Sequence, residues 1–378
     1  MTHSDGLTSR VIRQETEWDA IQPDWDALYA ACPLASPPMD FVWLRLWWRV
    51  YGDVYGSGGL RIVTVWRATR LIGVLPLYVS TGSGGRLALR TLRFISTGEA
   101  EEEEICPEYL GLLCLPEEEA ACHAAVWAEI GRLTWDHLEL LDLSAQSPLL
   151  TAGTLPIEAT VFSRGASFIA DLAGGFEAYL GRLSHHGRRT ARRLLREGER
   201  AGARLEIVTP DRGAQAFDDL RTLHQERWKA EGQPGVFSAK RFVDFHQGLI
   251  QAWQPAGRAV IARLWLSEEP VVVLYGFVSG QKFDFYQSGV RFDVDGQTGS
   301  PGILAILLLM QALADRHLTA FDFLRGPAAH KTRLATAEHL MVGVSAVRPT
   351  FRGTAFRMVQ TVATAVRKYF RTPTGVAR

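Results

Sequence analysis

Apolar residues follow helical spacing in some segments and form short strand-like runs in others, in a similar order in both halves of the chain. In the first half they predict helices at 16–31, 41–51 and 117–133, and strands at 60–66, 71–79, 87–95, 109–115 and 137–143. In the second half they predict helices at 176–201, 211–230, 239–252 and from 301, and strands at 168–172, 204–208, 259–266, 271–278, 283–290, 319–324 and 341–347. The order β-α-α-β-β-β-α-β-α-β predicts an α/β fold with a mixed sheet.

A junction divides the two halves. Gly, Ser and Pro are scattered between residues 144 and 165, which is typical of a linker. The length of 378 residues also exceeds that of most single domains. We therefore expect domains at 10–160 and 165–349, followed by a helix at 350–372.

The second half contains a small-residue loop, Gly299-Ser300-Pro301-Gly302, directly before an apolar run. Pro301 suits the first position of a helix and Ser300 suits the N-cap. Exposed backbone N–H groups and the helix dipole would attract an anion, and Gly302 would let a phosphate approach closely. We expect Gly299, Ser300 and Gly302 to bind the phosphates of a cofactor. The alternative is the ordinary start of a buried helix, because the spacing does not match the dinucleotide fingerprint.

Composition is that of a soluble globular protein, with 47% hydrophobic and 22% charged residues. Basic and acidic residues balance at 41 each, so we expect no DNA partner. Locally the charges are uneven: nine Glu and no Lys or Arg lie in 99–119, and eight Arg with two Glu lie in 182–204. The arginine run predicts either a solvated helix face or a site for nucleotide, lipid or tRNA phosphates.

The four cysteines, Cys32, Cys106, Cys114 and Cys122, form no C-x-x-C pair and have no His at metal spacing. They indicate buried thiols of a reducing compartment, and no metal is expected. The sequence begins without an apolar leader and has no run of about 18 apolar residues. We therefore expect a cytoplasmic protein.

The tail after Pro349 carries five Arg and one Lys and no acidic residue. Its spacing predicts an amphipathic helix whose apolar face holds Phe351, Met358, Val362, Val366 and Tyr369. Docking of this face on the second domain is the expectation. The alternative is weak association with a membrane surface, which sedimentation with anionic vesicles, before and after deletion of the tail, distinguishes.

Four strings in the second half carry a family resemblance: Tyr275-Gly276-Phe277, Phe285-Tyr286-Gln287-Ser288-Gly289, Ser300-Pro301-Gly302, and Phe321-Asp322-Phe323-Leu324-Arg325-Gly326 with Lys331. The chain resembles the CelD/BcsL-like GNAT acetyltransferases, which are related to the FemAB peptidyltransferases. The resemblance covers about 165–348, and the first half looks like a diverged copy. It implies tandem GNAT-like domains and acetyl-CoA or another acyl-CoA as donor.

Two features depart from the family pattern. The usual GNAT phosphate signature, Q/R-x-x-G-x-G/A, is not matched around Gly299 and Gly302. Relatives commonly have Tyr-Lys where this chain has His330-Lys331. Acetyl-CoA is therefore implied by the resemblance and not by a complete phosphate signature.

The resemblance implies transfer of an acyl group, in the first instance acetyl, from CoA to an amine or hydroxyl acceptor. The acceptor would be a sugar or a precursor of exopolysaccharide or cellulose. Two alternatives remain open: a FemAB-like transferase that uses aminoacyl-tRNA, and a catalytically silent scaffold of polysaccharide synthesis. Thiol release from acetyl-CoA distinguishes the first function from the other two.

Acyl transfer needs a base for the acceptor, polarisation of the thioester carbonyl and a proton for the leaving thiolate. Asp322, on an apolar strand expected to face the cofactor helix, would be a base with a pKa raised by desolvation, or would bond a neighbouring loop. His330 would be a base or a structural side chain. Tyr286 would donate a proton to the thiolate or fill the face of the sheet.

The remaining candidates would bind substrates. Lys331 would hold a phosphate or an anionic group of the substrate. The resemblance makes Arg227, Trp228 and Glu231 acceptor-binding candidates, although core packing also explains Trp228. In the first half three carboxylates at 117–119 would repel phosphate, so we expect a single CoA site per chain and a supporting role for the first domain.

Overall fold

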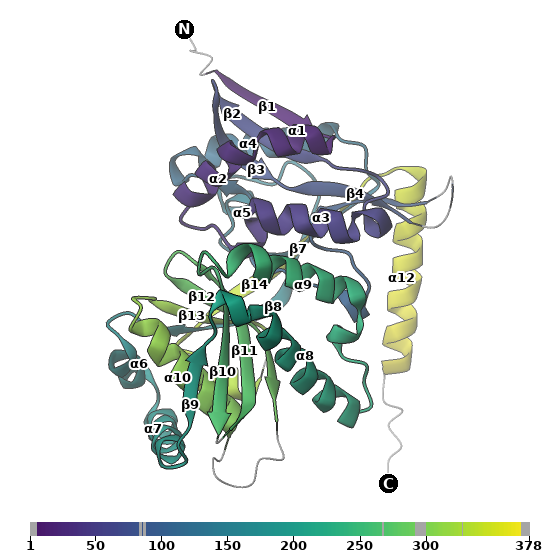
Figure 1. Ribbon diagram of the computed structural model, residues 1–378. Helices are drawn as coiled ribbons and strands as arrows, with labels where there is room; N and C mark the ends of the chain where they lie inside the picture. The colour runs from purple at the N-terminus through teal and green to yellow at the C-terminus, as the bar shows by residue number, and fades with distance from the viewer. Residues whose placement is uncertain are drawn as a thin grey trace.

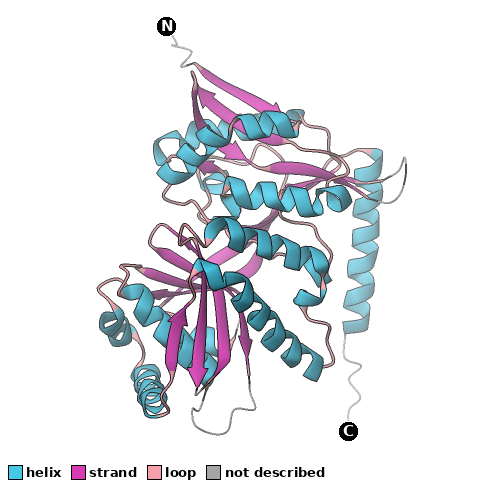
Figure 2. Cartoon of the chain, in the orientation of Figure 1, coloured by secondary structure: helices cyan, strands magenta, loops and turns pink. Residues whose placement is uncertain are grey.

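The computed structural model describes residues 6–82, 85, 88–266, 268–291, 300–326 and 328–371, with side chains to residue 361 (Figures 1 and 2). The α-helices are α1 Glu15–Ala20, α2 Gln22–Ala31, α3 Phe41–Tyr55, α4 Glu119–Arg132, α5 Pro148–Thr151, α6 Phe176–Arg182, α7 His185–Arg200, α8 Gly213–Ala230, α9 Lys240–Trp253, α10 Pro301–Ala314, α11 Ala329–Leu334 and α12 Phe351–Arg371. The strands are β1 Leu7–Ile12, β2 Ile62–Arg67, β3 Arg70–Leu75, β4 Leu77–Thr81, β5 Arg90–Phe94, β6 Leu113–Cys114, β7 His137–Ser144, β8 Thr160–Asp171, β9 Arg204–Ile207, β10 Ala259–Leu266, β11 Glu269–Ser279, β12 Lys282–Val290, β13 Ala320–Arg325 and β14 Ala337–Val347.

The strands of the described residues form two sheets. Four strands pair in the order β1-β2-β3-β6, and ten pair in the order β4-β5-β7-β14-β8-β13-β12-β11-β10-β9. The expected strand at 71–79 is split at Pro76, because proline has no N–H for the ladder, and its two parts join different sheets. The fold is the mixed α/β fold that the element order predicts.

The ten-stranded sheet crosses the junction expected at 160–165. Strand β8 begins at Thr160, and β14, the last strand in sequence, pairs with β8 on one side and with β7 of the first half on the other. The two halves therefore share one continuous sheet. The segment rich in Gly, Ser and Pro does not separate them into two sheets. Figure 1 shows the first half above the second, with this sheet passing between them.

Alternation along β10 and β11 separates the core of the second half into two layers. Ile261 and Val273 lie in the same cluster as buried residues of α8 and α9. Ala262 and Val272 point to the opposite face, where they join residues of α6, α7 and α10. Helices thus cover both faces, which is why these strands are apolar along most of their length.

An aromatic contact joins the halves. Trp43, Trp47 and Tyr51 of α3 are buried, and the Trp43 ring lies 5.1 Å from Phe245 of α9 and 5.3 Å from Phe277. The aromatic stripe at helical spacing is therefore core, as that spacing predicts. It fixes the first half against the helix layer of the second.

Helix α12 does not dock through its predicted apolar face. Phe351 is 77% and Met358 65% exposed, and the helix stands beside the body in Figure 1. Its contacts come from other positions: the Phe356 ring lies 4.8 Å from His137, and Arg357 donates to the carbonyl of Val347 at 2.6 Å. The docking expectation is thus wrong for the described side chains, and those of Val362, Val366 and Tyr369 lie outside them.

Association of α12 with a membrane surface stays a prediction. Within the described chain, the helices include none with the length and apolar character that crossing a bilayer demands.

Candidate functional site

Two parallel strands separate to open the main cavity. Strands β12 and β13 pair only from Lys282–Ala320 to Asp284–Asp322, although both continue further. Beyond that point β12 carries a bulge at Tyr286, which re-aims the strand. The strand ends and the facing elements enclose about 900 Å³, lined by Glu101, Glu102, Glu104, Cys106, Glu108, His224, Trp228, Gln233, Pro234, Gly235, Val236, Phe242, Phe285, Tyr286, Gln287, Ser288, Phe323, Leu324, Arg325, Gly326, His330 and Lys331.

The end of β13 holds an uncommon backbone conformation at the cavity wall. Leu324 has φ of 59°, in the left-handed region that is strained for a leucine. The Asp322 carboxylate accepts a hydrogen bond from the Leu324 N–H at 2.8 Å. Lys331 Nζ donates to the carbonyls of Leu324 at 3.3 Å and Arg325 at 2.8 Å. Asp322 therefore binds the N–H group of this turn, and Lys331 binds its carbonyl groups.

Asp322 faces away from the cofactor helix, contrary to the sequence expectation. Its neighbours Phe321 and Phe323 pack with α10, so the alternation of the strand directs Asp322 to the other face. There its fully buried carboxylate accepts from Tyr109 Oη at 2.5 Å and lies 3.5 Å from Lys282 Nζ, beside a second cavity of about 220 Å³. The sequence left open that Asp322 only bonds a neighbouring loop, and its hydrogen bond to the Leu324 N–H fits that alternative.

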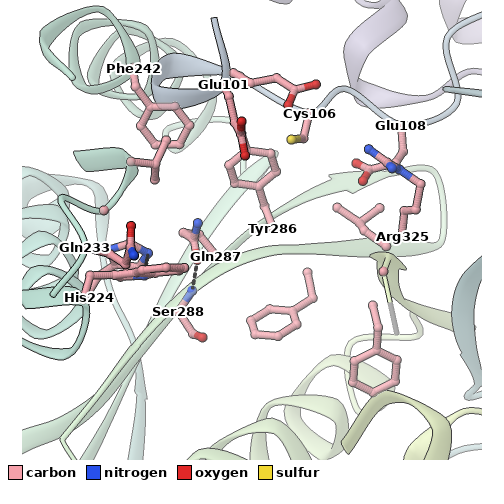
Figure 3. A pocket seen from close by; sticks show the side chains of 18 of the residues that line it. Glu101, Cys106, Glu108, His224, Gln233, Phe242, Tyr286, Gln287, Ser288 and Arg325 are labelled. Carbon is pink, nitrogen blue, oxygen red and sulfur yellow. Dashed lines mark hydrogen bonds between the residues drawn. The ribbon is translucent and has the colours of Figure 1, made fainter. Parts of the chain in front are cut away.

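A loop from the first half forms the opposite wall of the main cavity. Glu103 turns inward, where it pairs with Arg241 at 3.3 Å and accepts from Tyr55 Oη at 2.7 Å. The carbonyl of buried Ile105 accepts a hydrogen bond from Tyr286 Oη. On either side of these anchors, Glu101, Glu102 and Glu104 line the cavity, and Figure 3 shows the part of the wall near Glu101.

Glu108 is a carboxyl group that the sequence reasoning missed. It lines the cavity and is only 8% exposed, and burial raises its pKa to about 8, helped by the negative charge of Asp142 and opposed by Arg325 and Lys331. No hydrogen bond or ion pair joins it to the described residues. A carboxyl group that titrates near neutral pH inside a cavity suits general base catalysis. The signal in the sequence was the glutamate-rich run at 99–119, which does not reveal which member is buried.

Cys106 lies near Glu108 in the same wall (Figure 3), and Glu104 also lines the cavity. Burial, followed by the negative charges of Glu104 and Glu108, raises the pKa of its thiol well above the usual value. The thiolate is the nucleophilic form of cysteine. Cys106 therefore stays protonated, and an acyl-cysteine intermediate is disfavoured.

The site brings His330 and Lys331 into the cavity, as the sequence predicts. Burial, reinforced by the cations Lys331, Arg227 and Arg333, lowers the pKa of His330, so the imidazole is neutral at neutral pH. Burial also lowers the pKa of Lys331, whose ammonium group binds the two carbonyls of the β13 turn.

Tyr286 lines the cavity, but its hydroxyl belongs to a buried chain of hydrogen bonds. Because it donates to Ile105, it accepts from His246 Nε2 at 3.1 Å. The pKa of His246 is lowered to about 3 by burial, so its Nδ1 is unprotonated and accepts from Tyr275 Oη at 3.3 Å. Burial raises the pKa of Tyr286 well above its usual value. Proton donation to a thiolate would require Tyr286 to give up its bond to Ile105.

Of the acceptor candidates, only Trp228 lines the main cavity. Its indole N–H donates to His224 Nε2 at 2.9 Å, which fixes the ring in the wall. Arg227 and Glu231 form an exposed pair one helical turn apart, with 3.1 Å between Arg227 Nε and the Glu231 carboxylate. The sequence could not separate these three, because they are close along one helix and face different ways.

The start of α10 has the predicted form. Ser300 is the N-cap and Pro301 the first helical residue, and a side chain at Gly302 would lie 3.5 Å from Val290 at the end of β12. Gly299 lies outside the described residues. Binding of phosphate at Ser300 and Gly302 stays a prediction. Among the residues that the structure describes, no group of three or more His, Cys, Asp or Glu side chains is arranged to hold a metal ion.

The second half thus has two strands, β12 and β13, that separate, with helix α10 between them in sequence. Residues 185–332 match the family model described as an acetyltransferase (GNAT) domain. A comparison with curated proteins returned no significant match.

Solved structures resemble the whole chain. FemX has a TM-score of 0.60 at 11% identity, covering 93% of this chain and 99% of its own. The C-terminal domain of a putative lysylphosphatidylglycerol synthetase from Agrobacterium fabrum has a TM-score of 0.52 at 13% identity, covering 91% and 97%. A Bacteroides thetaiotaomicron protein of unknown function has a TM-score of 0.50 at 11% identity, covering 86% and 97%. At these identities the likeness establishes the fold, that of tandem GNAT-like domains.

Proposed function

We propose that this protein transfers an acyl group, acetyl in the simplest case, from CoA to an amine acceptor. The observation that carries the proposal is the cavity between β12 and β13, which holds a buried carboxyl group, Glu108, that has no partner among the described residues and whose pKa is raised to about 8. The match of 185–332 to a GNAT domain supports the class of reaction. The resemblance of the strand strings to CelD/BcsL-like enzymes supports a sugar or an exopolysaccharide precursor as acceptor.

The donor would lie along the gap between the splayed strands. Its phosphates would meet the N-terminus of α10 at Ser300 and Gly302, where the helix dipole favours negative charge. Its thioester would reach the wall formed by Tyr286 and Leu324. Lys331, which fixes the Leu324 turn, would hold the carbonyls of this wall in place.

The acceptor would enter from the side of the first half. Glu108 takes one proton from the ammonium group, and the freed amine nitrogen attacks the thioester carbonyl. A C–N bond forms and the C–S bond breaks. The second proton of the nitrogen goes to the departing sulfur, for which Tyr286 is the proposed carrier. The products are an amide and free CoA, and the net reaction releases one proton from the ammonium.

Transfer from aminoacyl-tRNA is the second candidate, and the arginines of α7 favour it by their charge. Several of them already have partners on the protein. Arg192 pairs with Glu177 at 3.1 Å, Arg193 pairs with Glu197 at 2.8 Å, and Arg188 donates to two backbone carbonyls. These contacts favour a solvated helix face, and we rank CoA first as donor.

Replacement of Gly302 by valine is expected to weaken CoA binding by roughly tenfold or more, because the side chain covers the N–H groups at the start of α10. The nearest atom to the added Cβ is a Val290 methyl group at 3.5 Å, an ordinary contact, so the variant should fold. Calorimetric titration should give one CoA site per wild-type chain.

Gly131→Val is the matched control, because Gly131 lies in α4 with open space at its Cβ position. Unchanged CoA affinity in a folded Gly302→Val protein, or two sites per wild-type chain, would refute the proposed donor site.

A further inference from the structure

We infer that the acceptor carries a second positive charge in addition to the amine that is acylated. This inference rests on the proposed function and specifies its substrate class. It starts from four carboxyl groups on one wall of the main cavity, those of Glu101, Glu102, Glu104 and Glu108. A wall of one sign concentrates ligands of the opposite sign.

The positive charges of Arg325 and Lys331 act on Glu108 without forming an ion pair with it. Among the described residues, none forms an ion pair with any of these four glutamates. The cations that line the cavity are engaged elsewhere: Arg325 Nε lies 3.2 Å from the Asp142 carboxylate, and Lys331 donates to the carbonyls of the β13 turn. Glu103, another glutamate of the same loop, has a cationic partner, Arg241, and does not line the cavity.

The acidic wall is a built surface. Its anchors are the Glu103–Arg241 pair and the bond from Tyr286 to the Ile105 carbonyl, which tie the loop to α9 and β12. The aromatic rings of Trp228 and Phe242 line the same cavity, and Figure 3 shows Phe242 next to Glu101. Aromatic faces attract ammonium groups and provide an apolar bed for the chain between two charges.

The four carboxyl groups differ in depth. Glu108 is 8% exposed and has no partner in the described structure, so it is the group that meets the reacting amine. Glu101 and Glu102 line the same cavity and are exposed, so a second ammonium group would sit beside them (Figure 3 shows Glu101). An acceptor with a carboxylate or phosphate in that place would be repelled by both.

Three acceptors with the same carbon chain test the inference: cadaverine, pentylamine and aminovalerate, whose far ends are positive, neutral and negative. With full-length protein and saturating acetyl-CoA, thiol release should give kcat/KM values that fall in that order, by about tenfold per step. The double variant Glu101→Gln, Glu102→Gln should raise KM for cadaverine by about tenfold at unchanged kcat. Its KM for pentylamine should not change.

Glu117→Gln is the control, because Glu117 is an exposed glutamate outside the cavity lining. Equal kcat/KM for the three acceptors, or an unchanged cadaverine KM in the double variant, would overturn the inference while thiol release upholds the proposed function. Absence of thiol release with every acceptor, together with absence of CoA binding by calorimetry, would overturn both.

Discussion

Glu108→Gln is expected to lower kcat by about 10²- to 10⁴-fold, the range that a general base contributes. The wild-type rate should rise with pH up to about 8, because the carboxyl group must lose its proton before it can accept one. The variant should lose this limb of the pH–rate profile and keep its affinity for CoA. A variant that retains more than half of the wild-type kcat would exclude Glu108 as the base, and Glu117→Gln again serves as the control.

The same substitution should stabilise the protein at higher pH. The folded-state pKa of Glu108, about 8, lies above the ordinary value of 4.5, so the folded state holds this proton more tightly than the unfolded state. The free energy of unfolding therefore decreases as pH rises from about 4.5 to about 8, by an amount on the order of a few kcal/mol. Thermal denaturation at both ends of this window should show Glu108→Gln melting above wild type only at the alkaline end. Equal melting temperatures there would contradict the buried, unpaired carboxylate.

Asp322→Ala is expected to cost about 3–5 kcal/mol of stability, the usual result of removing one partner of a buried ion pair. Without the Asp322 carboxylate, the Leu324 N–H and Tyr109 Oη have no acceptor at this position. Lys282 also loses one of the two carboxylates with which it pairs. Burial alone would lower the pKa of Lys282, but the attraction of Asp284 and Asp322 outweighs it and raises the pKa. Denaturation in urea measures the effect.

Asp322→Asn distinguishes a positioning residue from a base. The amide oxygen can still accept from the Leu324 N–H, so the strained turn should persist and the pH–rate profile should keep its shape. If Asp322 were the base, as the sequence suggested, the folded Asn variant would lose both kcat and the alkaline rise. That result would restore Asp322 to the catalytic group.

Sequence periodicity predicted most elements because each depends on residues close together in the chain. The start of α10 at Pro301 and the buried stripe of α3 are local patterns of this kind. The path of β14 between β7 and β8 is not local, since it pairs residues about 200 positions apart in sequence. For this reason the sequence did not reveal that the two halves share one sheet.

The candidate site shows the same limit. The sequence named His330, Lys331, Tyr286 and Trp228 as site residues, and all four line the cavity. All four belong to the second half, which carries the family resemblance. Sequence reasoning missed Glu108, whose burial is imposed by residues of the other half. It also misjudged the direction of Asp322, since one step along a strand reverses the face that a side chain meets.

Mass spectrometry of the acceptor, after incubation of the full-length protein with acetyl-CoA and amine, tests the central claim most directly. The account predicts an amine heavier by one acetyl group, formed in equal amount with free CoA thiol and dependent on Glu108. Acylated amine formed only from aminoacyl-tRNA, with acetyl-CoA left intact, would contradict it.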